Sequence, residues 1–168
     1  RTSAQLAGRG RDAEGLWSFL LAAAHYSAGA YEDAHSAATD SVHGLVERDF
    51  IGLEPAARAL LAGAAARLGR IAEAKETLAA LPPTTRDDQR AALLVARAEA
   101  VIAVAEGRAR EGIDALARAA ADGIAGGFGA MAAVAAHDAV AFGGAATVVE
   151  VLESVAETTD GEFFGLLA

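Results

Sequence analysis

The side chains that could do chemistry in this sequence are its four histidines, His25, His35, His43 and His137, and a few carboxylates. His35 and His43 lie eight residues apart, about two turns on a helix, whereas a metal site on one helix face needs an i, i+4 pair. His137 and Asp138 are neighbours, so on a helix they point about 100° apart and cannot form the bond of a catalytic dyad. These spacings predict neither a metal site nor a catalytic pair.

Two carboxylate pairs, Glu32-Asp33 and Asp87-Asp88, have a structural interpretation that needs no catalysis. Each pair lies near a predicted helix start, where the helix dipole favours negative charge by about 0.3–1 kcal/mol. The sequence has no cysteine, and no serine or threonine stands in the setting of an activated nucleophile. We therefore expect no enzyme activity and no cofactor in this segment.

Glycines recur at nearly fixed distances in segments that otherwise read as amphipathic helices. The stretch "RLGRIAEAKETL" contains Gly69, and similar stretches surround Gly29, Gly107 and Gly143, at steps of 40, 38 and 36 residues. Glycine adopts the left-handed conformation that closes many helices without a Cβ penalty. The repeated pattern predicts that each of these glycines is the turn of a helical hairpin.

The helical spacing on both sides of the glycines predicts four helix-turn-helix repeats, 13–47, 55–81, 87–121 and 127–158. Residues 1–12 are expected to be a lead-in or the end of a preceding repeat, and residues 162–168 the start of a further helix. Pro82-Pro83 cannot continue a helix and so separates two repeats, and Thr85 and Asp88 resemble a capping box that opens the next helix. Asp-Gly pairs at 122–123 and 160–161 are predicted to end the last helices of the third and fourth repeats.

The predicted fold is all-α, a right-handed α-solenoid of about four helical hairpins. No useful alternating strand pattern occurs, and a hairpin of this length buries its apolar stripe only by stacking on the next one. The sequence has 47 alanines and only 5% aromatic residues. We expect a core in which helix backbones approach closely, with leucine, valine and isoleucine as the larger side chains.

Charge and composition exclude several partners. The net charge is −9 and Lys75 is the only lysine, so the segment lacks the basic face that nucleic acid requires. No secretory signal is visible, and the longest run free of both charged residues and histidine, 123–136, is too short to span a membrane. The absence of cysteine fits a reducing compartment. We therefore expect a cytoplasmic location, with no membrane contact and no direct contact with nucleic acid.

The first two repeats resemble tetratricopeptide repeats, helical hairpins of about 34 residues with small residues at the helix crossings. The matching positions are Leu21, Ala22, Gly29, Tyr31 and Ala34 in the first repeat, and Leu61, Ala62, Gly69, Ile71 and Ala74 in the second. Repeats three and four depart from the pattern, and all four are longer than the family standard.

A second resemblance covers Ala135 to Ala168, which is similar to the repeat region of large LuxR-type transcriptional regulators of actinobacteria. The residues that carry it are His137-Asp138, Ala139, Gly143, Leu152 and Asp160-Gly161. It implies a non-catalytic module that senses a small-molecule inducer or a partner protein, in a parent chain with ATP-binding and helix-turn-helix modules. Two alternatives remain: a free-standing adaptor for protein–protein interaction, and a helical small-molecule-binding or enzymatic domain.

The first helices of stacked hairpins line the concave side of a solenoid, which usually carries binding. Mapped onto those helices, the larger or more polar residues predict a ligand or partner groove made of Phe19, Tyr26, Arg67, Arg97, Val101 and His137. Its arginines could accept an acidic peptide or an anionic small molecule. In the alternative interpretation Phe19 and Val101 belong to the core and the arginines serve solubility. The many alanine-lined faces could equally mediate homo-oligomerisation.

Overall fold

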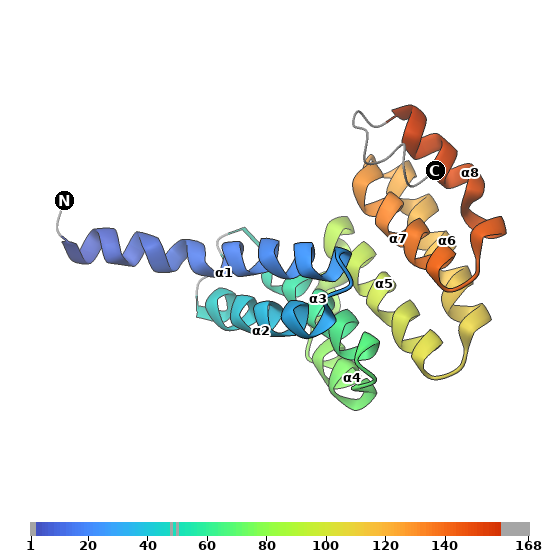
Figure 1. Cartoon of the computed structure of the whole chain (residues 1–168). Coiled ribbons are helices and arrows are strands. Elements are labelled where there is room, and N and C mark those ends of the chain that lie inside the picture. The colour runs from blue at the N-terminus through green and yellow to red at the C-terminus, as the bar shows by residue number, and fades with distance from the viewer. Residues whose placement is uncertain (1–2, 48, 50, 159–168) are drawn as a thin grey trace. The chain divides into compact units, whose positions relative to one another are not determined.

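The computed structural model describes residues 3–47, 49 and 51–158. Every regular element in these ranges is helical, which confirms the all-α prediction. Figure 1 shows pairs of antiparallel helices joined by short turns, the hairpins of which a helical solenoid is built. The elements are α1 (Ser3–Ser27), α2 (Tyr31–Glu47), α3 (Glu54–Arg67), α4 (Ile71–Ala79), the 3₁₀ turn η1 (Pro83–Asp87), α5 (Gln89–Ala105), α6 (Ala109–Ala125), α7 (Gly129–Ala141) and α8 (Ala145–Thr158).

The turns that close the hairpins share one hydrogen-bond pattern. In the first, the amide of Ala30 donates to the carbonyl of His25 (2.9 Å) and that of Gly29 donates to Tyr26 (3.1 Å). This is the Schellman arrangement, which places the residue after the helix in the left-handed region. The turns with this hydrogen-bond pattern have a glycine with φ between +76° and +90° at that position: Gly29, Gly69, Gly107, Gly127 and Gly143. The four predicted turn glycines are confirmed, and Gly127 joins them.

The prediction that Asp122-Gly123 ends a helix is wrong, because α6 continues to Ala125. Gly123 is buried at the crossing of α6 and α7, where an added Cβ would lie 3.0 Å from the Cβ of Ala132. The glycine therefore allows two helices to approach and does not form a turn. The Asp160-Gly161 exit and the helix expected at 162–168 lie outside the described residues, and the predicted lead-in of residues 1–12 is helical from Ser3.

The predicted capping box at Thr85 is also wrong. Thr85 is buried within η1, and the N-cap of α5 is Asp88. The Asp88 carboxylate accepts hydrogen bonds from the amides of Arg90 (2.8 Å) and Ala91 (3.3 Å) and from the Arg90 guanidinium (2.9 Å). The Arg90 side chain is the main cause that lowers the pKa of Asp88, and the two amides add to it.

The chain divides into two compact units, residues 1–85 and 86–168, and each has its own core. In the first unit α1 packs on α2, α2 on α3, and α3 on α4. Its main cluster consists of Ala22, Tyr26, Ala34, Ala37, Ala38, Leu60 and Ala64. Two contacts between residues 38 apart connect α2 to the next hairpin: Nε2 of His35 lies 2.6 Å from Oε1 of Glu73, and Arg70 donates to Glu32 (2.8 Å).

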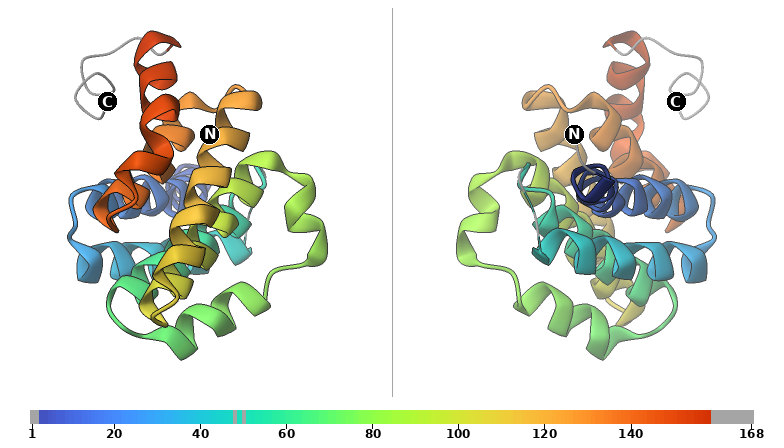
Figure 2. Two further views of the ribbon diagram at one scale, coloured as in Figure 1. Left: turned by 90° about the vertical axis from the view of Figure 1, so that its right-hand side faces the viewer. Right: turned by 90° about the vertical axis from the view of Figure 1, so that its left-hand side faces the viewer.

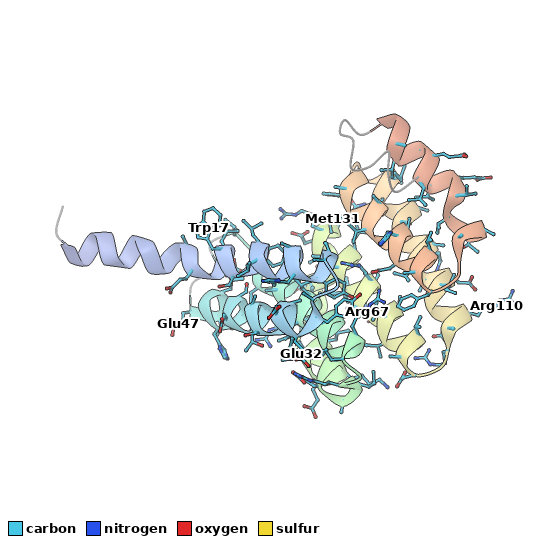
Figure 3. All side chains as sticks on the ribbon, viewed as in Figure 1. Trp17, Glu32, Glu47, Arg67, Arg110 and Met131 are labelled. Carbon is cyan, nitrogen blue, oxygen red and sulfur yellow. The ribbon has the colours of Figure 1, made fainter. Side chains whose placement is uncertain are left out.

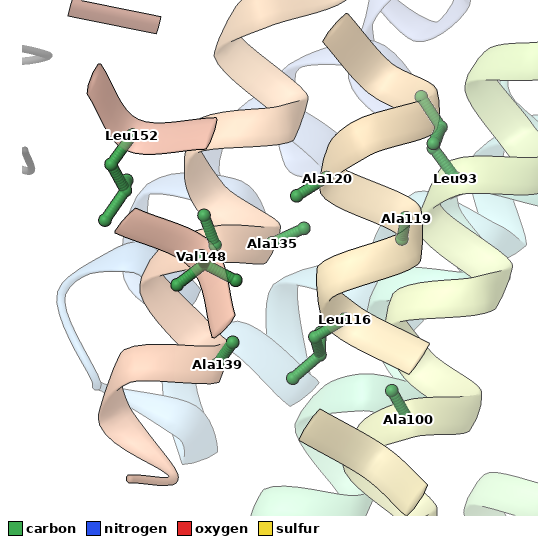
Figure 4. Packing of buried hydrophobic residues seen from close by; sticks show 10 residues of the cluster. Leu93, Ala100, Leu116, Ala119, Ala120, Ala135, Ala139, Val148 and Leu152 are labelled. Carbon is green, nitrogen blue, oxygen red and sulfur yellow. The ribbon is translucent and has the colours of Figure 1, made fainter. Parts of the chain in front are cut away.

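The core of the second unit lies between α5, α6, α7 and α8 (Figure 4). Leu116 of α6 and Val148 of α8 are among its largest fully buried side chains. The remaining space is filled mainly by alanines of α6 and α7: Ala119, Ala120, Ala135, Ala136 and Ala139. Helices α5 and α6 pack against each other and are joined by the turn at Gly107; Figure 2 shows this unit from two further sides.

Helices α1 and α2 cross at a pair of glycines. A Cβ on Gly15 would lie 2.9 Å from Cγ of Leu45, and one on Gly44 would lie 3.0 Å from Cα of Gly15. The hydroxyl of Ser41, fully buried at this crossing, donates to the carbonyl of Gly15 (2.8 Å). The two backbones are therefore in direct contact, which no residue with a Cβ would permit without movement.

We expect Gly15→Ala to destabilise the protein, although alanine is the better helix former by about 1 kcal/mol. Overpacking at the crossing should cost about 1–3 kcal/mol, which exceeds the gain in helix propensity. Gly44→Ala should behave similarly. Because either methyl group alone already forces the two helices apart, the double variant should lose less than the sum of the two single losses. Urea unfolding followed by circular dichroism measures this, and a stabilised Gly15→Ala variant would contradict the crossing geometry.

Candidate functional site

The six residues predicted to form a concave groove are divided between the two units. Phe19, Tyr26 and Arg67 belong to the first unit, and Arg97, Val101 and His137 belong to the second. Each half is therefore described separately, and the groove through all six residues stays a prediction.

In the first unit the predicted residues form an aromatic and arginine cluster. Tyr26 is only 5% exposed and meets Tyr31 edge to face, with ring centroids 5.3 Å apart and planes at 72°. The guanidinium carbon of Arg67 lies 5.4 Å from the centroid of Tyr31, within cation–π range. Phe19 is half-buried and packs against the core. Phe19 and Tyr26 thus contribute to the packing of this unit.

In the second unit Arg97 already binds a carboxylate of its own chain. Nε of Arg97 donates to Oδ2 of Asp138 across 2.5 Å, and the two side chains are 12% and 7% exposed. Val101 is 1% exposed, as the core alternative predicted, whereas His137 is exposed. The helical geometry separates His137 from Asp138 as expected: one faces solvent, and the other connects α7 to α5.

The open groove of this unit lies along α5 and α6, and the sequence analysis missed it. It has a volume of about 740 Å³. Its floor is made almost entirely of small side chains: Ala92, Leu93, Ala96, Ala100 and Ala103 from α5, Ala115, Ala119 and Ala125 from α6, and Gly126 directly after α6. The signal was present in the sequence: alanines recur at i, i+4 and i+8 on α5 and at i and i+4 on α6. The same spacing is typical of core packing, so it did not single out a groove.

Charged side chains of both signs line the rim: Arg86, Glu99, Glu111, Arg118 and Asp122. Arg86 donates to Glu99 (2.6 Å). Glu111 is paired with Arg108. This contact is the main cause that raises the pKa of Arg108, and the contact with Glu106 is the second. Arg118 and Asp122 are exposed, and their side chains form no ion pair with any other residue the structure describes. Among the rim residues, one free charge of each sign therefore remains, one turn apart on α6.

This arrangement can bind but offers little for catalysis. The rim supplies guanidinium and carboxylate groups, and the floor supplies a shallow apolar surface without a hydroxyl or thiol nucleophile. In the described part of the chain no three His, Cys, Asp or Glu side chains gather as metal ligands. In the same residues no helix is both long and apolar enough to cross a bilayer.

The buried pair of α5 and α7 gives a stability prediction. Arg97→Ala should lower the free energy of unfolding by about 3–5 kcal/mol, because it leaves the Asp138 carboxylate buried without its guanidinium. Arg86→Ala is the matched control: it removes an exposed pair, 58% and 48% exposed, and should cost at most about 1 kcal/mol.

Denaturant titration of the two variants measures both effects. The double variant Arg97→Met, Asp138→Leu should recover most of the loss, because apolar side chains of similar size replace a buried ion pair at little cost. Equal losses for Arg97→Ala and Arg86→Ala would contradict the buried pair.

Comparison with known proteins supports the helical repeat. The family model of the tetratricopeptide repeat matches residues 53–98, which contain α3, α4, η1 and the first part of α5. No curated protein and no solved structure matches the chain. Tetratricopeptide repeats are typically non-catalytic modules that mediate protein–protein interaction. Residues 53–98 are therefore similar to a tetratricopeptide repeat, within a chain whose described part is built of helical hairpins.

Proposed function

We propose that the chain is a non-catalytic interaction module that binds a segment of a partner protein in the groove between α5 and α6. The observation that carries the proposal is this groove, an open surface of small side chains with charges of both signs along its rim. The tetratricopeptide match supports the same class of function.

The chemistry of the groove favours a polypeptide over a nucleic acid. Its rim has three carboxylates and two guanidiniums, and the whole chain carries a net charge of −9, so a polyphosphate would be repelled. A protein segment offers what the groove can receive, namely apolar side chains for the alanine floor and a charge of each sign for Arg118 and Asp122. The alanine floor lets the partner backbone approach closely.

The finer form of the proposal places this module in a LuxR-type transcriptional regulator. The support is the similarity of Ala135–Ala168 to the repeat region of such proteins. Occupancy of the module by an inducer or a partner protein would then change its contacts with neighbouring modules, and so release or assemble the regulator. Such coupling requires a ligand with different affinities for two states.

Site-specific photocrosslinking tests the interaction surface. A photoreactive amino acid at Glu99, in the groove, should capture a protein of defined mass in cells that express the chain, whereas one at Arg110 should not. Arg110 lies on α6, one of the two helices that form the groove, but does not line the groove and projects away from it (Figure 3).

The captured partner then allows an affinity measurement with matched charge reversals. Arg118→Glu should weaken binding by about tenfold or more, because it repels the acidic group that Arg118 attracts, and Arg110→Glu should leave affinity nearly unchanged. No capture from Glu99, equal capture from Arg110, or an unaffected Arg118→Glu complex would each refute the groove.

The regulator proposal has its own test, the intact mass of the endogenous polypeptide that contains this segment. We expect a chain several times heavier than 16.9 kDa, with a basic helix-turn-helix sequence at its carboxy end. A native mass near 16.9 kDa would refute the regulator and favour the free-standing adaptor, with no effect on the groove proposal.

A further inference from the structure

Helix α1 carries a row of large apolar side chains that its own unit does not cover. Trp17 is 67% exposed, Leu20 47% and Leu21 53%, and Ala24 is also exposed. The positions 17, 20, 21 and 24 have the i, i+3, i+4, i+7 spacing of one helix face. Figure 3 shows Trp17 on the side of α1 away from α2. We call these four residues the α1 stripe.

The stripe is separate from the face that α1 uses within the fold. Gly15, Ala22 and Tyr26 are buried and pack against α2 and α3. α1 is therefore apolar on two sides, and only one of them is buried. Single exposed apolar residues are common on protein surfaces, but a contiguous row containing tryptophan and two leucines is typical of an interaction site.

The surroundings of the stripe lack charge. From Gly15 to Tyr31 the sequence has no Asp, Glu, Lys or Arg, although 22% of the whole chain is charged. Two copies of this acidic chain could approach each other along this segment without placing like charges face to face. The depletion of charge at the centre of a surface, with charges only beyond it, is a property of protein interfaces.

We propose that the α1 stripe binds a second copy of this chain, with the two α1 helices antiparallel about a twofold axis between Leu20 and Leu21. In that register residue pairs whose numbers add to 41 face each other. Trp17 of one copy lies over Ala24 of the other, and Leu20 lies against Leu21. The bulkiest side chain thus meets the smallest, so the stripe is complementary to itself, as a twofold interface requires.

The size of the stripe sets the strength of the dimer. Its three large side chains expose on the order of 300–400 Å² of apolar surface per copy, compared with about 800 Å² per partner in a standard interface. Because the surface is smaller than a standard interface, we expect a weak dimer, with a dissociation constant of about 10–100 μM.

The position of Trp17, the only tryptophan, makes the test direct. Sedimentation velocity of the 168-residue chain from about 1 to about 500 μM should show monomer converting to dimer. Trp17 emission should shift to shorter wavelength over the same concentration range, because dimerisation buries its indole. A monomer with unchanged Trp17 emission at every concentration would overturn the proposal.

Charge substitutions in the stripe test the register. Leu20→Glu and Leu21→Lys should each remain monomeric, while an equimolar mixture of the two should form a heterodimer, because the antiparallel register places the new carboxylate against the new ammonium. Both positions are exposed on a helix and both replacements are good helix formers, so the fold should be retained, as circular dichroism will show.

The matched control is Val149→Glu on α8, which is 46% exposed, nearly the same as Leu20. It should dimerise as the parent chain does, and so should Arg118→Glu, whose effect belongs to the groove alone. A dimer that survives Leu20→Glu, a mixture that stays monomeric, or loss of the dimer in the Val149→Glu control would each overturn the assignment to the α1 stripe.

Discussion

The close approach of helix backbones is the constraint on which the rest of this structure depends. At the crossing of α1 and α2 the glycines at 15 and 44 touch through their main chains, and at the crossing of α6 and α7 the glycine at 123 faces the alanine at 132. Alanine fills most of the remaining helix contacts. Because these side chains have no rotamers to lose, the helices pack without the entropy cost of ordering long side chains. Each contact also buries little apolar area, so many such contacts are needed to stabilise the fold.

The turns of this fold could be predicted closely from the sequence, whereas the α5–α6 groove could not. Helix ends are set by local chemistry, and the left-handed glycines at 29, 69, 107 and 143 marked them in the sequence. Asp122-Gly123 misled for a physical reason: the same residue type serves in a turn and at a tight crossing, and only the partner helix distinguishes the two roles. Thr85 misled because a capping residue is defined by which amide it faces, which depends on the path of η1.

The candidate site could be identified only from the way one helix packs against another. Arg97 was predicted to be available to an anionic ligand, but it binds the carboxylate of Asp138, 41 residues away in the sequence. No spacing in the sequence indicates that these two residues form a pair. Alanines at helical spacing define one face of a helix, but they do not indicate whether another helix, a partner protein or solvent lies against that face. The α5–α6 groove and the exposed side of α1 became visible only when the neighbours of each helix were known.

The separation of the chain into two units has a consequence for its unfolding. The cluster around Tyr26 and the cluster around Leu116 have no residue in common, so each unit can lose its own core while the other remains packed. We therefore expect the two units to differ in stability, so that states with one unit folded are populated during unfolding. Hydrogen exchange would distinguish two cooperative blocks of amides, and a single melting temperature would describe neither block.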